Sequence, residues 1–198
     1  MNNIPQFFET NEYFIDQKVN YFKFEVEYKV FNQTGIQIGF IRQRLSGKQK
    51  AMRLFLSKGM LPFVLEIMDM DRNVLAVIKR GWTFWMSEIQ VLTPHHEIIG
   101  KIRQKWSFMK PVFHINDAHD NKIANIKGDW KGWNFQINDP SGSPIGTINK
   151  KWAGAMKEMF TYADKYNVSI REEYEEDTDK IVVVSTAITI DMVLKESK

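Results

Sequence analysis

One spacing of apolar and small residues recurs five times along the chain. Each repeat has an apolar residue, a small residue nine positions later, an isoleucine two positions after that, and a large apolar residue four positions further on. The five sets are Val30/Gly39/Ile41/Leu45, Ile67/Ala76/Ile78/Trp82, Val91/Gly100/Ile102/Trp106, Ile115/Ala124/Ile126/Trp130 and Ile137/Gly146/Ile148/Trp152. A fixed repeat of this kind indicates one supersecondary unit that is used over and over.

Each repeat has the pattern of a β-hairpin. Apolar and polar positions alternate beside the turn, as Phe113 and Ile115 do with His114. Between the first and second positions of each repeat lies a cluster of turn formers: NQTG, DMDRN, TPHHE, DAHDN or DPSGS. A period of two with a turn between predicts a hairpin, and short joins between hairpins favour an antiparallel meander. A propeller is the rival architecture, but its four-stranded blades need a period of about 40 residues.

The number of strands predicts how the sheet closes. Five hairpins supply ten strands, and residues 13–15 and 166–172 are expected to add two more. A sheet of this size tends to close, and a barrel of about twelve strands is too wide for its own side chains to fill. The run 181–194 is apolar on all sides and predicts a helix in the bore, with Asp179 as its N-cap. Its valine, isoleucine and threonine content alone favours a strand.

We therefore predict a single domain over residues 1–198, mainly β (α+β by content). It is a closed antiparallel β-barrel of about 12 strands around a central C-terminal hydrophobic helix. Residues 1–11 are expected to form a loose N-terminal segment. The insertion 47–58 (GKQKAMRLFLSK) has helical spacing of its apolar residues.

Composition excludes several kinds of chemistry. The chain has no cysteine, so disulfides, thiolate metal sites and a cysteine nucleophile are excluded. No leader pattern and no apolar run of about 20 residues is visible, so we expect a cytoplasmic chain without a transmembrane span. No Ser/His/Asp arrangement or glycine-rich phosphate loop stands out, so we expect no enzyme. His114 and His119 lie near Asp117 and Asp120 in the sequence. A solvated turn is a simpler interpretation of these residues than a metal site.

Two stretches carry a family resemblance. Residues 146–170 (GTINKKWAGAMKEMFTYADKYNVSI), followed by the apolar C-terminal run, resemble the phospholipid scramblase family. Residues 13–35 (YFIDQKVNYFKFEVEYKVFNQTG) are similar to the start of LURP-one-related proteins. Both groups belong to the Tubby C-terminal-like superfamily, so the resemblance, over about residues 12–195, implies a twelve-stranded barrel around a central hydrophobic helix.

The resemblance also raises calcium. The scramblase segment assigned to calcium reads Asp-Ala-Asp-x-Phe-x-Ile-x-Phe, whereas here Tyr162 replaces the first carboxylate and Lys165 adds a positive charge. Because calcium needs six to eight oxygen ligands, Asp164 is only a weak candidate ligand and we expect no cofactor. The proline-rich arm and acylated cysteines of animal scramblases are also missing from this sequence.

Charges segregate along the hairpins. The turns carry mainly acids: Asp69, Asp71, Glu97, Asp117, Asp120 and Asp139, against Arg72 and Lys122. The opposite strand ends carry cations, opposed in the same segments only by Asp129, and the insertion adds more. The predicted basic rim comprises Arg42, Arg44, Lys48, Lys50, Arg53, Lys79, Arg80, Arg103, Lys105, Lys127, Lys150 and Lys151.

A basic rim edged with tryptophan suits the headgroups of anionic phospholipids, including phosphoinositides. We therefore expect a non-enzymatic binding module at the inner face of a membrane. A protein-interaction or regulatory module is the main alternative, followed by calcium-dependent phospholipid scrambling and nucleic-acid binding. The rim cations would also be explained as solvated charges that protect strand ends.

Overall fold

The computed structural model describes residues 4–20, 25–44, 62–81, 88–107, 110–129, 133–150, 165–174 and 177–195. The described strands are β1 (Glu12–Asn20), β2 (Glu25–Phe31), β3 (Gln37–Arg44), β4 (Phe63–Met68), β5 (Val74–Arg80), β6 (Glu88–Leu92), β7 (Ile98–Ser107), β8 (Lys110–Asp117), β9 (Lys122–Asp129), β10 (Asn134–Asn138), β11 (Pro144–Asn149) and β12 (Lys165–Ile170). The described helices are the 3₁₀-helix η1 (Gln6–Phe8) and the α-helix α3 (Thr178–Lys195).

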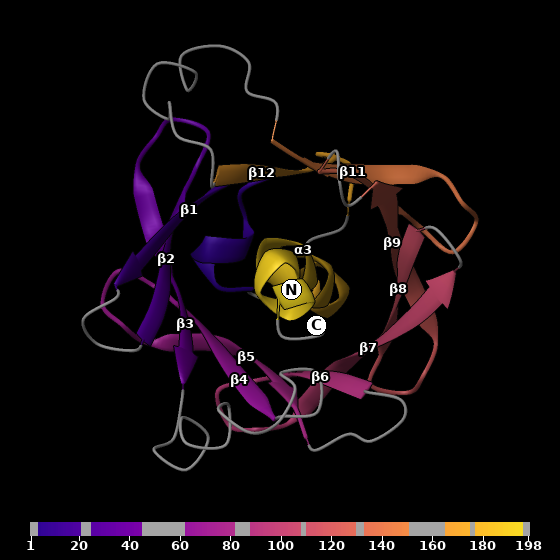
Figure 1. Ribbon diagram of the computed structural model, residues 1–198, viewed down its shortest axis with the longest axis horizontal. Helices are drawn as coiled ribbons and strands as arrows, with labels where there is room; N and C mark the ends of the chain where they lie inside the picture. The colour runs from indigo at the N-terminus through magenta and orange to yellow at the C-terminus, as the bar shows by residue number, and fades with distance from the viewer. Residues whose placement is uncertain are drawn as a thin grey trace.

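The strands close into one antiparallel barrel. Each pairs with its neighbours in sequence, and β1 pairs with β12 to complete the ring. Helix α3 runs through the middle of this ring (Figure 1). The predicted barrel around a C-terminal helix is confirmed. The first strand, β1, is longer than the segment 13–15 that the sequence suggested, and β12 ends at Ile170, before the expected residue 172.

The repeat forms the inner lining of the barrel. In every hairpin the first apolar residue lies directly opposite the small residue, as Val91 does with Gly100. The isoleucine two positions on pairs with an apolar residue of the next strand, as Ile102 does with Ile115. These side chains have no exposed area. A Cβ atom on Gly100 would lie 2.4 Å from a methyl carbon of Val182, so the missing side chain lets α3 approach β7.

The five turns share one backbone design. Each spans five residues, closed by a hydrogen bond from the first residue's N–H to the fifth residue's carbonyl. The fourth residue has a left-handed φ in all of them: Gly35, Arg72, His96, Asp120 and Gly142. A β-bulge follows at the same place in each hairpin, which explains why the spacing across the turn is nine rather than eight residues.

Helix α3 is buried on all sides, from Val182 to Leu194. The barrel wall surrounds it, so packing overrides the strand preference of its valine and isoleucine residues. Its threonine hydroxyls donate to carbonyls one turn back, as Thr186 does to Val182 at 2.7 Å. The predicted N-cap is wrong by two residues. Asp177, not Asp179, accepts the backbone N–H groups of Asp179 and Lys180.

Residues 4–11, which we expected to be loose, instead pack against the barrel at the start of α3. Phe8 of η1 is fully buried and Phe7 nearly so, with their rings 5.0 Å apart. The buried Lys180 reaches the same segment and donates to the side-chain oxygen of Asn11 at 3.0 Å. The segment is ordered because its two phenylalanines bury apolar area that the sequence pattern alone did not assign to the core.

The predicted helical insertion 47–58 lies outside the described residues, as do the repeat residues Leu45, Trp82, Trp130 and Trp152. Across the parts of the chain that the structure describes, none of the helices has both the length and the apolar character needed to cross a bilayer.

Candidate functional site

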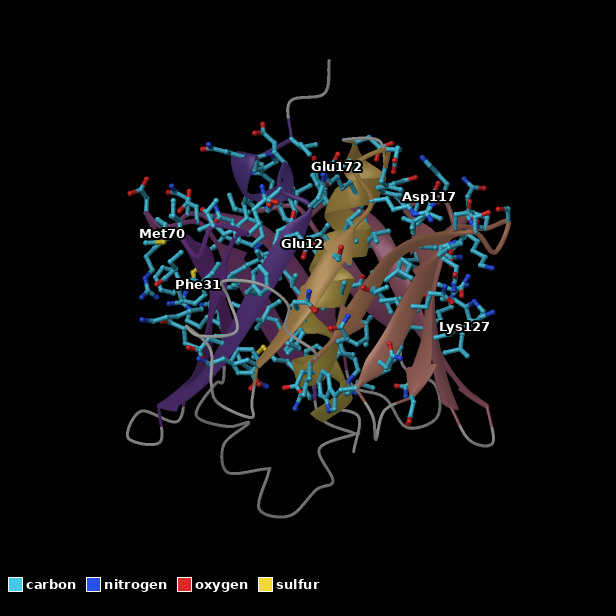
Figure 2. The ribbon with its side chains drawn as sticks, turned by 90° about the horizontal axis from the view of Figure 1, so that it is seen from above. Glu12, Phe31, Met70, Asp117, Lys127 and Glu172 are labelled. Carbon is cyan, nitrogen blue, oxygen red and sulfur yellow. The ribbon has the colours of Figure 1, made fainter. Side chains whose placement is uncertain are left out.

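The two ends of the barrel differ in sequence and charge. We call the end that carries the five hairpin turns (32–36, 69–73, 93–97, 117–121 and 139–143) the turn end. We call the end where β3, β5, β9 and β11 finish the distal end. Figure 2 shows Met70, Asp117 and Glu172 toward the turn end, where α3 begins, and Lys127 closer to the distal end.

Three acids of the turn end serve the turns themselves. Asp117 Oδ1 accepts the backbone N–H of Asn121 at 2.8 Å, and Asp69 and Asp139 make the equivalent bond in their own turns. The hydrogen bond from the Asn121 side chain is the main cause that lowers the pKa of Asp117. The Ser141 hydroxyl does the same for Asp139. The carboxylates of Asp117 and Asp139 are therefore ionised at neutral pH, and all three aspartates are already engaged by the fold.

A second acidic residue of the same turn binds cations of the wall. Asp120 pairs with Lys101 at 2.7 Å and with Arg103 at 3.0 Å, and the bond from Lys101 is the main cause of its lowered pKa. Arg103 also pairs with Glu88 at 2.9 Å, and this bond chiefly raises its pKa. Arg103, predicted to bind lipid, is thus held between two carboxylates.

Two predicted site residues share one carboxylate near the distal end. Arg42 and Arg44 both project from the outer face of β3 and bind Glu66 of β4, at 2.7 and 3.1 Å. The Glu66 side chain is almost covered by them, while Arg44 keeps 67% of its own side-chain area exposed. Two arginines share one carboxylate in these ion pairs, and the Arg44 side chain remains open to solvent.

Two lysines complete the outward cations. Lys79, the penultimate residue of β5, and Lys127, two residues before the end of β9, are both exposed. Within the described ranges neither lysine has a carboxylate at salt-bridge distance. Lys79 and Arg44 flank Val64 in register on its two sides, which puts them about 10 Å apart across the outer wall.

Other predicted residues lie elsewhere or cannot be placed. Arg80 points into the barrel, is 2% exposed, and holds its guanidinium 4.7 Å from the centre of the Phe63 ring. The alternation of β5 explains this, since Lys79 faces outward and the next residue must face inward. Lys150 stacks on Trp133 with its Nζ 4.5 Å from the ring centre. Lys48, Lys50, Arg53 and Lys151, and the side chain of Lys105, lie outside the described residues.

Sequence reasoning missed the carboxylates that oppose the basic residues. It counted only the second strand of each hairpin, where Asp129 is the single acid, and left out the acids of the first strands. Glu66 and Glu88 lie on those first strands and pair with the cations across the sheet. Pairing register could have revealed them, because Glu66 is directly opposite Arg42 and Glu88 opposite Arg103.

Within the described residues we find no catalytic arrangement of metal-ligating or buried polar side chains. No group of three histidine, aspartate or glutamate side chains converges there, and Asp164 lies outside them. The buried Asp191 of α3 accepts a 3.0 Å hydrogen bond from the Tyr28 hydroxyl. Tyr166 donates to the Ile188 carbonyl, and its pKa is raised by burial and then by Asp191.

Comparisons with known proteins bear on the family and the fold. The chain matches the model of the Scramblase family over residues 7–197. A protein of known X-ray structure from Arabidopsis thaliana superposes with a TM-score of 0.57 at 9% sequence identity, over 92% of this chain and 90% of that chain. At this identity the likeness shows the fold alone. No curated protein matches the chain significantly.

Proposed function

Because the chain belongs to the Scramblase family, which relates it to phospholipids, we propose that it binds anionic phospholipid surfaces without catalysing a reaction. The cations on the outer wall near the distal end make the contact, with Arg44, Lys79 and Lys127 as its centre. The turn end faces away from the membrane.

One observation carries this proposal: toward the distal end lie exposed cations that the described fold does not use. Asp69, Asp117 and Asp139 of the turn end are tied into turns, whereas Lys79 and Lys127 are exposed and have no ion-pair partner within the described ranges. A cationic surface near a strand end is attracted to an anionic bilayer, while the acidic opposite end is repelled. The molecule therefore has a preferred orientation.

The expected affinity follows from the number of free cations. Each lysine or arginine near an anionic membrane contributes about 1 kcal/mol, so Lys79 and Lys127 contribute about 2 kcal/mol, or about thirtyfold in affinity. Arg44 and Arg42 each add less, because both pair with Glu66, which neutralises part of their charge. Binding of this strength weakens steeply with salt, since these charges are exposed.

Cosedimentation with vesicles tests the proposal. Vesicles of phosphatidylcholine alone are compared with vesicles that also contain phosphatidylserine or a phosphoinositide, at about 50 mM and about 300 mM salt. We expect sedimentation with the anionic vesicles at low salt, little with phosphatidylcholine, and loss at high salt. Equal sedimentation with both lipid classes, or none at low salt, contradicts the proposal.

We propose that the protein binds the lipid surface without transferring lipid between the leaflets. Helix α3 is buried along its length inside the barrel, so within the described residues it offers no polar track to a lipid headgroup. In vesicles with fluorescent lipid, dithionite should bleach only the outer leaflet after the protein is added. Bleaching of both leaflets in intact vesicles would show scrambling.

A further inference from the structure

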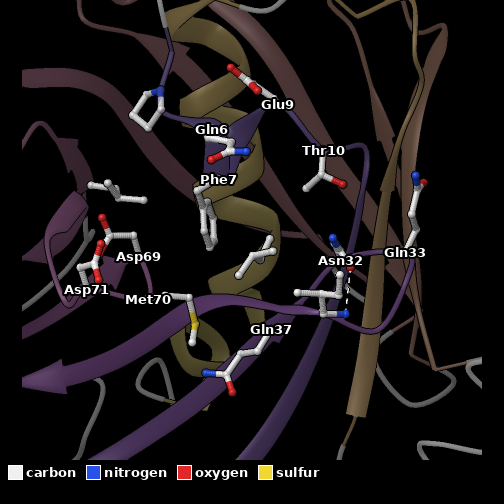
Figure 3. Close-up of a pocket in the computed structure, with 14 residues that line it drawn as sticks. Gln6, Phe7, Glu9, Thr10, Asn32, Gln33, Gln37, Asp69, Met70 and Asp71 are labelled. Atoms are coloured by element: carbon white, nitrogen blue, oxygen red, sulfur yellow. Dashed lines mark hydrogen bonds between the residues drawn. The ribbon is translucent and has the colours of Figure 1, made fainter.

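A pocket of about 670 Å³ opens at the turn end between η1, the β2–β3 turn and the β4–β5 turn. Figure 3 shows Asp71 and Met70 on one side of it, Thr10 and Gln33 on the other, and Phe7 between them. Phe7 is only 5% exposed, so the pocket is built on the core. Its volume falls within the range of protein sites that take side chains or small ligands.

The other hairpins show that the apolar residues of this pocket are not needed by the turns. Ile36 is 63% exposed and Met70 is 50% exposed. The residues at the same turn position as Ile36 are Asn73, Glu97, Asn121 and Ser143. Those at the same turn position as Met70 are Gln33, Pro94, Ala118 and Pro140. A long flexible or branched apolar side chain therefore occurs at these positions only where the pocket is.

The charge of the pocket has one sign. Glu9, Asp69 and Asp71 line it, and the described lining residues include no lysine, arginine or histidine. Asp69 is engaged by Asn73, but within the described part of the chain the carboxylates of Glu9 and Asp71 have no ion-pair partner. The nearest turn cation, Arg72, is bound instead to Glu27 at 2.6 Å and lies over the Phe40 ring.

We propose that this pocket docks a segment of a partner protein in which a leucine, methionine or similar side chain is flanked by lysine or arginine. The apolar side chain enters between Ile36 and Met70 toward Phe7. The flanking cations then reach Glu9 and Asp71 on opposite sides. Because the barrel is closed and offers no free strand edge, the segment is recognised through its side chains rather than by adding a strand.

A peptide series with two independent variables tests this proposal. Four labelled nonapeptides are compared. The first combines lysine and arginine with leucine and methionine. The second replaces the apolar residues by serine, the third replaces the cations by glutamine, and the fourth replaces the cations by glutamate. Fluorescence anisotropy with the full chain should show the first peptide binding at least about ten times more tightly than each of the others. No saturation with the first peptide, or equal binding of the cation-with-serine peptide, overturns the proposal.

Substitutions in the pocket test whether the peptide binds there. Ile36→Asn, which installs the residue found at that position in two other turns, should weaken the first peptide about tenfold without lowering Tm. Glu9→Lys with Asp71→Lys should shift the preference to the peptide with glutamate. Ile98→Asn is the matched control, since Ile98 is 40% exposed but does not line the pocket, and it should change nothing.

Two further readouts exclude other occupants. Sedimentation velocity should show no concentration-dependent dimer; a dimer that Ile36→Asn abolishes would assign this face to a second copy and overturn the proposal. Ile36→Asn should leave vesicle cosedimentation unchanged, because the pocket and the proposed lipid surface lie at opposite ends. Loss of vesicle binding in that variant would also overturn it, since the turn end would then be a membrane contact.

Discussion

The two ends of the barrel use charged residues in different ways. At the turn end, Asp69, Asp117 and Asp139 repeat one hydrogen bond in three turns, and each holds its own loop in shape. Toward the distal end, Lys79 and Lys127 project from the wall and the described fold makes no such use of them. A charge that the fold uses is a poor guide to function, whereas an exposed charge without a structural task is a better one.

Pairing refines this contrast. Arg103 and Lys101 lie on the same wall as the free lysines, but Asp120 of the turn end binds both of them. Lys101 lies opposite Asn116, next to the turn that holds Asp120, so a place on the second strand of a hairpin does not by itself fix the charge environment. The basic surface is therefore smaller than a count of lysines and arginines suggests.

Loss of core volume at the turn end should have the largest effect on the stability of the protein. Phe8→Ala removes a fully buried ring from the segment that closes this end, and we expect about 3–5 kcal/mol less stability. Urea denaturation measures it. Ile36→Asn, on the same end but exposed, is the control and should cost little. A Phe8→Ala protein as stable as the parent would mean that η1 is not part of the folded core.

The second-largest effect on stability is expected at the contact between the barrel wall and α3. Gly100→Ala places a Cβ against Val182 and should destabilise the protein by about 1–3 kcal/mol through overpacking. Gly81→Ala is the matched control, because a Cβ there meets no atom of the described residues within 4 Å. Thermal unfolding of the two variants should separate them by several degrees. Equal Tm values would show that the helix does not pack at Gly100.

The turn carboxylates should have a smaller effect. Asp117→Ala removes the acceptor of the Asn121 and His119 backbone N–H groups, so Tm should fall by a few degrees. Asp117→Asn keeps an acceptor oxygen and should retain most of the stability. Lys122→Ala, an exposed neighbour, serves as control. If the alanine and asparagine variants melt at the same temperature, the hydrogen bond is not what holds the turn.

The smallest effect on stability is expected when the turn carboxylates are protonated at low pH. The pKa values of Asp117 and Asp139 are lowered in the folded state, so their contribution is present above the ordinary aspartate pKa of about 4 and is lost as pH falls through the lowered values. The pKa of Asp179 is raised by burial, so its protonation acts in the opposite direction.

Differential scanning calorimetry at pH 7 and at about pH 3 checks this sign. The fall in Tm between the two should be smaller in Asp117→Asn than in the parent protein, and larger in Asp179→Asn, which removes the opposing contribution. The reverse order would show that the stated directions are wrong.

The sequence predicted the architecture because the repeat records which residues face inward. The pairs of small and apolar residues lie opposite each other across each hairpin. The need to fill a wide bore, together with the family resemblance, placed the C-terminal run inside despite its strand preference. The closing segment at residues 4–11 escaped prediction, because two adjacent phenylalanines have no periodicity.

The surface was harder to predict for a different reason. Whether a cation is free depends on its neighbours across the sheet, and the sequence does not state the register. Arg80 was assigned to the surface although its alternation with Lys79 would have placed one of the two inside. The apolar turn residues Ile36 and Met70 became informative only when the five turns were aligned on their shared backbone.

One strand offers the most direct test of the central claim, that the distal end and not the turn end contacts anionic lipid. Lys122 and Lys127 are both exposed lysines of β9, near its opposite ends. Cosedimentation with phosphatidylserine vesicles at about 50 mM salt should weaken about tenfold or more in Lys127→Glu and remain unchanged in Lys122→Glu. Equal losses in the two variants, or a greater loss in Lys122→Glu, would contradict the account.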